Sequence, residues 1–102
     1  MGAAPEVLLD DTSGTVASEV WAYAATVYSL LAGRSPFEVP GADNSSAELI
    51  SRITRAKPQP IDRPDVPAAL ERLLQNAMVR DPARRPSSVL ELVRGLQAIE
   101  TE

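Results

Sequence analysis

Cysteine and histidine are both absent from this chain. Their absence excludes a disulfide framework, a thiol nucleophile, a zinc finger and an imidazole general base. Any metal site would therefore have to use carboxylates alone. The lack of cysteine is compatible with an intracellular protein, and we expect a cytoplasmic location.

Long apolar runs and an excess of positive charge are also lacking. The longest stretch without a charged residue, Val20 to Gly33, is shorter than the roughly 20 apolar residues of a membrane-spanning helix. Met1 is followed by Gly-Ala-Ala-Pro-Glu rather than by a basic and then an apolar segment, so no secretion signal is expected. Ten Lys and Arg against 14 Asp and Glu give a net charge of -4, which opposes binding to phosphate backbones and anionic lipid. We therefore expect neither a nucleic-acid partner nor a membrane partner.

The composition is that of a folded protein, and the periodicity is helical. The 102 residues are 44% hydrophobic and 24% charged, which suffices for one small domain. Proline and glycine divide the chain into a short helical turn at residues 4–9 and four longer helical segments. Because no segment alternates apolar and polar residues over a sustained length, the prediction is an all-α fold.

Each of the four longer segments has recognisable end signals. The first is expected to begin at a Ser18 cap and to end at Gly33 in a left-handed conformation. The second is expected to begin with a capping box formed by Ser45 and Glu48, and to stop before Pro58. Its inward-facing residues are predicted to be Leu49, Ile50 and Ile53.

The last two segments are amphipathic. The third follows Pro67, and the fourth is expected to begin at Ser87 or Ser88, with Glu91 completing a capping box for Ser88. The apolar stripe of the third segment is Leu70, Leu73, Leu74, Ala77 and Met78, at helical spacing. That of the fourth is Val89, Leu92, Val93, Leu96 and Ile99.

The first long segment differs from the other three because it is apolar around its whole circumference. Residues 20–32 carry no charge, and their large side chains point in many directions. A helix of this kind must be buried on every side, whereas a surface helix shows one apolar stripe. The alternative is that its small residues form a side that faces solvent. The other helices are too short to enclose it, so we expect part of it to contact protein that this chain does not contain.

Three motifs carry a resemblance that spans nearly the entire chain. Residues 4–6 read A-P-E, and residues 18–37 follow the pattern S-D-V-W-S-L-G-x-x-L-Y-E-L-L-T-G-x-x-P-F, with Glu19 in place of its aspartate. Residues 81–87 follow D-P-x-x-R-P-T/S. In order and spacing they resemble the eukaryotic-type serine/threonine protein kinases, from the A-P-E motif to the last helix of the large lobe. The resemblance implies that residues 1–102 are a single partial domain, the helical subdomain of a kinase C-lobe with helices EF, F, G, H and I.

The resemblance also implies particular structural residues. Glu6 of A-P-E is expected to pair with Arg85, whose planar guanidinium suits a two-pronged contact with a carboxylate. The alternative is two solvated charges. Glu19 and Trp21 are the expected anchors of helix F, where the family's aspartate holds the backbone of the catalytic loop. Glu19 is one methylene longer than that aspartate and Ala24 replaces the usual glycine, which leaves a pseudokinase parent open.

The residues that perform phosphoryl transfer in this family are missing. Kinases need a glycine-rich loop, a strand lysine, and the H-R-D and D-F-G motifs, all of which precede A-P-E. Here the five glycines form no G-x-G-x-x-G, neither of the other motifs occurs, and the only lysine is Lys57. The other nine basic residues are arginine, which is compatible with a GC-rich bacterial source. We predict that the chain is inactive and holds no catalytic, metal or cofactor residue, whereas its parent uses ATP and Mg²⁺.

Two roles follow for the chain itself. The first is a scaffold in which helix F holds elements supplied by the missing remainder of the kinase domain. The second is docking of a protein substrate or regulator on the segment 37–57. The expected docking residues are Phe37, Glu48, Arg52 and Arg55. An exposed helix F would also allow a homo-oligomer, and a stand-alone helical interaction adaptor is the alternative to a kinase-derived segment.

Overall fold

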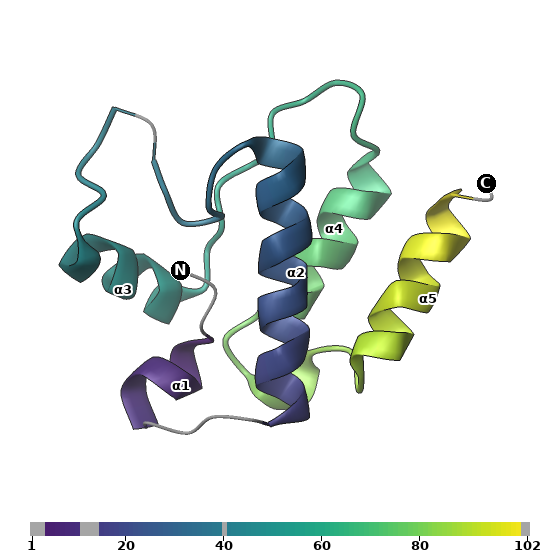
Figure 1. Cartoon of the computed structure of the whole chain (residues 1–102), viewed down its shortest axis with the longest axis horizontal. Coiled ribbons are helices and arrows are strands. Elements are labelled where there is room, and N and C mark those ends of the chain that lie inside the picture. Colours follow the sequence, from purple (N-terminus) through teal and green to yellow (C-terminus); the bar gives the residue numbers. More distant parts are fainter. Residues whose placement is uncertain (1–3, 11–14, 40, 101–102) are drawn as a thin grey trace.

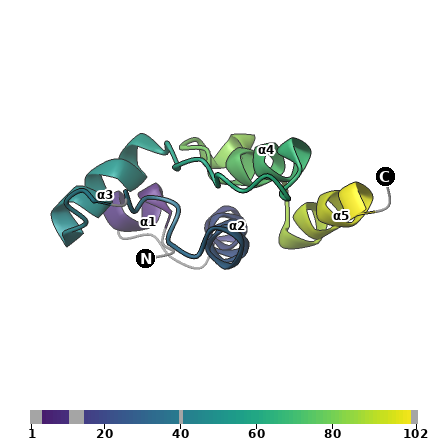
Figure 2. The same ribbon diagram turned by 90° about the horizontal axis from the view of Figure 1, so that it is seen from above.

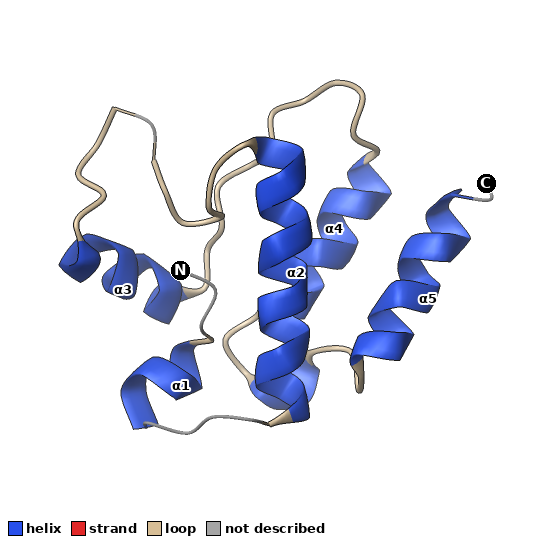
Figure 3. Cartoon of the chain, in the orientation of Figure 1, coloured by secondary structure: helices blue, strands red, loops and turns tan. Residues whose placement is uncertain are grey.

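The computed structural model describes residues 4–10, 15–39 and 41–100. These residues form α-helices and one short 3-10 helix, and none of them lies in a strand (Figure 3). The all-α prediction is therefore confirmed for this part of the chain. In chain order the elements are α1 (Pro5–Asp10), α2 (Val16–Ala32), α3 (Ser46–Arg55), α4 (Ala68–Ala77), η1 (Pro82–Arg84) and α5 (Val89–Glu100).

The helices form a flat slab of 40 × 33 × 17 Å. The longest helix, α2, stands in the middle of the slab (Figure 1), where it packs against α4, α5 and η1. Figure 2 looks along the slab and shows α1 and α3 together at one end and α5 at the other. One helix with its side chains is about 10–12 Å thick, so a slab of this depth does not enclose α2 on every side.

Helix α2 begins three residues earlier than the sequence predicts. Thr15, in extended conformation, accepts a hydrogen bond from the backbone N–H of Ser18 at 3.1 Å and thereby caps the helix. The prediction of Ser18 as the cap is wrong, because Ser18 lies in the first turn and donates its own hydroxyl to the Thr15 carbonyl. At the other end Gly33 has a φ of 75° and donates to the Ser29 carbonyl, which confirms the predicted left-handed end.

Helix α3 departs from its predicted capping and orientation. Ser45 occupies the cap position but makes no side-chain capping bond, so the predicted capping box with Glu48 is wrong. The carboxylate of Asp43 instead accepts a hydrogen bond from the Ser45 N–H at 2.9 Å. Ile53 is buried as predicted, whereas Ile50 is 38% exposed and faces away from the core.

Helices α4 and α5 match their sequence signals closely. Leu74, Ala77 and Met78 of the predicted α4 stripe are fully buried, and the other two residues of the stripe pack against the core. At the start of α5, the hydroxyl of Ser88 accepts the N–H of Glu91, as predicted. The second half of that capping box differs, because the Glu91 carboxylate accepts a hydrogen bond from the Ser87 hydroxyl.

The hydrophobic core lies on one side of α2. Its largest fully buried side chains come from α2, from the loops on either side of α3, and from α3, α4 and α5. They are Trp21, Tyr28, Phe37, Ile53, Ile61, Leu74, Met78 and Leu92. No helix in the described part of the chain has the length and apolar character needed to cross a membrane.

Candidate functional site

Trp21 is the central side chain of the buried side of α2. It is fully buried, and its indole stacks on the Phe37 ring with a centroid separation of 5.7 Å and an interplanar angle of 5°. The guanidinium carbon of Arg85 lies 4.9 Å from the centroid of the Trp21 ring system. The cation and the second ring thus hold an α2 side chain against two loops that are distant in the sequence.

Arg85 donates hydrogen bonds to three separate stretches of the chain. Its Nη1 and Nη2 donate to the two carboxylate oxygens of Glu6 at 2.7 and 2.8 Å. Nη1 also donates to the carbonyl of Ala17 in α2, at 3.0 Å. Nε donates to the carbonyl of Val79 at 2.9 Å, and Nη2 to that of Arg80 at 3.3 Å. The guanidinium therefore ties α1 to the beginning of α2 and to the segment between α4 and η1.

The Glu6–Arg85 pair is largely shielded from water. The Arg85 side chain is 0% exposed and that of Glu6 is 17% exposed. The hydrogen bonds from Arg85 hold the pKa of the Glu6 carboxyl below its ordinary value, although partial burial acts in the opposite direction. Because both partners are ionised and mostly desolvated, loss of either one leaves a buried charge without its partner.

The expected anchor residues at the start of α2 lie in different environments. Trp21 is buried in the core, whereas Glu19 is exposed in the first turn of the helix. The Arg85 guanidinium pairs with Glu6 rather than with Glu19, whose side chain is exposed to solvent.

The four expected docking residues do not form one surface. Phe37 is 1% exposed and stacked on Trp21, so its side chain differs from the expectation of an exposed contact residue. Arg52 donates from Nη1 to the Phe37 carbonyl at 2.9 Å and to the Asn44 side-chain oxygen at 2.8 Å. It therefore holds the preceding loop in place. Only Glu48 and Arg55 are exposed as expected.

The opposite side of α2 is apolar and incompletely covered; we call it the open side. Val16, Tyr23 and Leu30 are 54%, 37% and 79% exposed. Next to them lies a groove of about 320 Å³ between α2, α4 and α5. It is lined by Tyr23, Val27, Leu31, Leu70, Val93, Leu96 and Gln97, none of which is charged.

Sequence reasoning missed the polar contacts that hold the segment between α3 and α4. Arg34 donates to the Pro60 carbonyl at 2.8 Å, and Glu71 accepts the Ile61 N–H at 2.9 Å. Arg63 donates to the Leu31 carbonyl at 2.9 Å. Backbone carbonyls and amides accept and donate without any sequence signature, so no motif could have identified these contacts.

Comparison with known proteins places these features in a family. The family model for protein tyrosine and serine/threonine kinases matches residues 3–96. The chain therefore belongs to the protein kinase family, and its helices correspond to a helical part of a serine/threonine kinase C-lobe.

Individual relatives agree with this assignment at low identity. Serine/threonine-protein kinase SAPK3 of Oryza sativa subsp. indica is 35% identical over 82 residues, which cover 80% of this chain and 25% of that protein. Serine/threonine-protein kinase PknK of Mycobacterium bovis is 31% identical over 100 residues, covering 95% of this chain and 9% of that protein. Serine/threonine-protein kinase A of Synechocystis is 34% identical over 87 residues, which cover 83% of this chain and 16% of that protein. The chain thus spans a quarter or less of the length of these relatives.

Proposed function

We propose that this chain is the structural core of a serine/threonine kinase C-lobe and that α2 is the axis on which the rest of the lobe assembles. The observation that carries the proposal is the difference in burial between the two sides of α2. One side is fully buried by the chain's own helices, and the other presents apolar side chains and an uncharged groove. The Glu6–Arg85 pair fixes α1, which begins within the A-P-E residues, to this axis. The kinase resemblance implies that A-P-E closes the activation segment of the parent.

The open side of α2 has the pattern of a helix-packing surface. Val16, Tyr23 and Leu30 are seven residues apart, and this spacing places them in a line along one side of the helix. Exposed apolar surface of this kind is typical of protein interfaces. In the proposed assembly it is covered by other polypeptide of the same kinase domain, which is the principal partner of this chain.

The chain by itself is proposed to be inactive as a phosphotransferase. The parent would transfer the γ-phosphate of ATP to a protein serine or threonine, with Mg²⁺ bound by residues that precede A-P-E. Within this sequence no glycine-rich loop, H-R-D or D-F-G motif occurs to hold nucleotide and metal. The cytoplasm is the proposed location of the parent, with which the absence of cysteine is compatible.

The origin of the chain is tested by reading the genomic DNA upstream of the Met1 codon. A kinase-derived segment requires an open frame that encodes D-F-G and H-R-D motifs before A-P-E. If the positions of both motifs are recognisable but other residues replace the aspartates, the parent is a pseudokinase. The substitution at Glu19 is compatible with this outcome. A stop codon immediately upstream would overturn the scaffold proposal and favour a stand-alone adaptor.

The proposed inactivity is tested by titrating the purified chain with Mg·ATP in a calorimeter. We expect no saturable heat of binding. Saturable binding with one site per chain would contradict the assignment of the nucleotide site to residues outside this sequence.

A stand-alone helical interaction adaptor is the second candidate, and one observation favours it. The accessible surface of the chain is 6003 Å². A folded monomer of this size is expected to expose about 5,600 Å². Because the two areas are similar, the chain by itself buries nearly as much surface as a folded monomer of its size. The two candidates differ in what covers the open side: other parts of a kinase domain, or a separate protein.

Docking on α3 is a further part of the proposal, now restricted to its exposed side. Glu48 and Arg55 are exposed there, and Ile50 places an apolar side chain between them in the sequence. In the longer kinase, Ile50→Ser with Arg55→Glu should slow phosphorylation of an intact protein substrate. Phosphorylation of a short peptide cut from that substrate should be unchanged, and an equal loss for both would refute docking at α3.

A further inference from the structure

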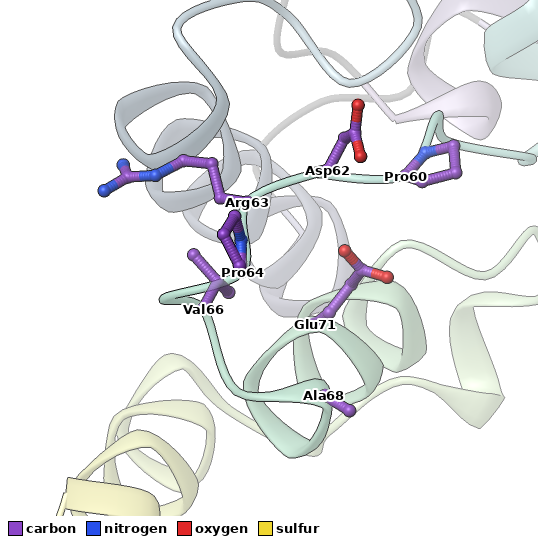
Figure 4. A pocket seen from close by; sticks show the side chains of 7 residues that line it. All are labelled: Pro60, Asp62, Arg63, Pro64, Val66, Ala68 and Glu71. Atoms are coloured by element: carbon purple, nitrogen blue, oxygen red, sulfur yellow. The ribbon is translucent and has the colours of Figure 1, made fainter.

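We draw no further inference here: the strongest candidate, the open pocket of about 400 Å³ between residues 60–66 and the first turns of α4 (Figure 4), rests on the carboxylates of Asp62 and Glu71, and no second observation in the structure points to a ligand there.

Discussion

The two sides of α2 have similar side chains but opposite surroundings. Trp21 and Tyr28 on one side are fully buried, whereas Tyr23 and Leu30 on the other are 37% and 79% exposed. Apolar composition alone does not distinguish the two sides, because both carry large apolar side chains, although the exposed Glu19 adds a charge to the open side in the first turn. The difference shows that the described residues leave part of the apolar surface of α2 uncovered. In the proposed assembly, the remainder of the kinase domain covers this open side.

The same contrast separates two ion pairs with the same chemistry. Arg85 and Glu6 are 79 residues apart, and their side chains are 0% and 17% exposed. Arg63 and Asp65 are two residues apart, and their side chains are 46% and 63% exposed. In both pairs the guanidinium contacts both carboxylate oxygens. Burial and chain separation therefore decide which pair stabilises the fold, since an exposed local pair is screened by water and closes no loop.

The largest effect is expected from a cavity on the buried side of α2. Trp21→Ala removes the indole that contacts Phe37 and Arg85, and should lower the free energy of unfolding by about 3–5 kcal/mol. The matched variant Leu30→Ala on the open side should change it by no more than about 0.5 kcal/mol. Urea unfolding followed by far-ultraviolet circular dichroism measures both. Equal losses would mean that the two sides of α2 do not differ as described.

A smaller loss is expected from neutralising Glu6. Glu6→Gln leaves the buried Arg85 without a counter-charge, and should cost about 3 kcal/mol, near the lower end for a broken buried pair because the amide oxygen still accepts a hydrogen bond. Asp65→Asn is the control, since it breaks the exposed pair and should leave the unfolding midpoint unchanged. If the two variants are destabilised alike in the same urea titration, burial does not determine how much each ion pair contributes to the free energy of unfolding.

The pH dependence of stability provides a finer version of the same test. The pKa of Glu6 is lower in the folded chain than its ordinary value because of the hydrogen bonds from Arg85. Its contribution is therefore fully present above the pKa of the unfolded state and is lost as pH falls through the folded-state pKa. The thermal midpoint of the wild type should fall more steeply on acidification than that of Glu6→Gln. Parallel curves for the two proteins would show that Glu6 is not ionised in a protected pair.

A local effect is expected from Arg52, because it donates hydrogen bonds to the loop between α2 and α3. Arg52→Ala removes hydrogen bonds to the Phe37 carbonyl and to Asn44, and should cost about 1 kcal/mol. Because Asn44 also accepts the Val39 N–H, the Val39 amide should exchange faster with deuterium. Arg55→Ala, on the exposed side of α3, should alter neither measurement. Unchanged exchange at Val39 in Arg52→Ala would refute the loop-holding role.

The helices could be predicted from the sequence better than the details of their ends. Proline, glycine and apolar spacing located the five α-helices of the described residues, but not the short 3-10 helix η1, which lies where the sequence predicts only a break. Two caps were wrong because several side chains compete for the same amide groups. Thr15 takes the position predicted for Ser18, and Asp43 accepts the N–H of Ser45. Local competition of this kind depends on backbone angles that a spacing rule does not contain.

The residues of the site were predictable only where a motif joined distant positions. Glu6 and Arg85 were paired through the kinase resemblance, since no local pattern relates residues 79 apart. Phe37 and Arg52 were expected on a docking surface because the sequence does not state which side of the 37–57 segment faces the core. The structure uses both internally, one in the ring stack with Trp21 and the other in the loop contacts.

Sedimentation equilibrium of the isolated chain over a wide concentration range tests the open side of α2 most directly. Uncovered apolar surface should drive reversible self-association of the wild type. Leu30→Glu, which places a charge on the most exposed apolar residue of the open side, should be monomeric and about as stable as the wild type, whereas Asn76→Glu on the exposed side of α4 should associate like the wild type. A wild-type chain that remains monomeric at every concentration would contradict the proposal that the open side of α2 is an interface for other protein.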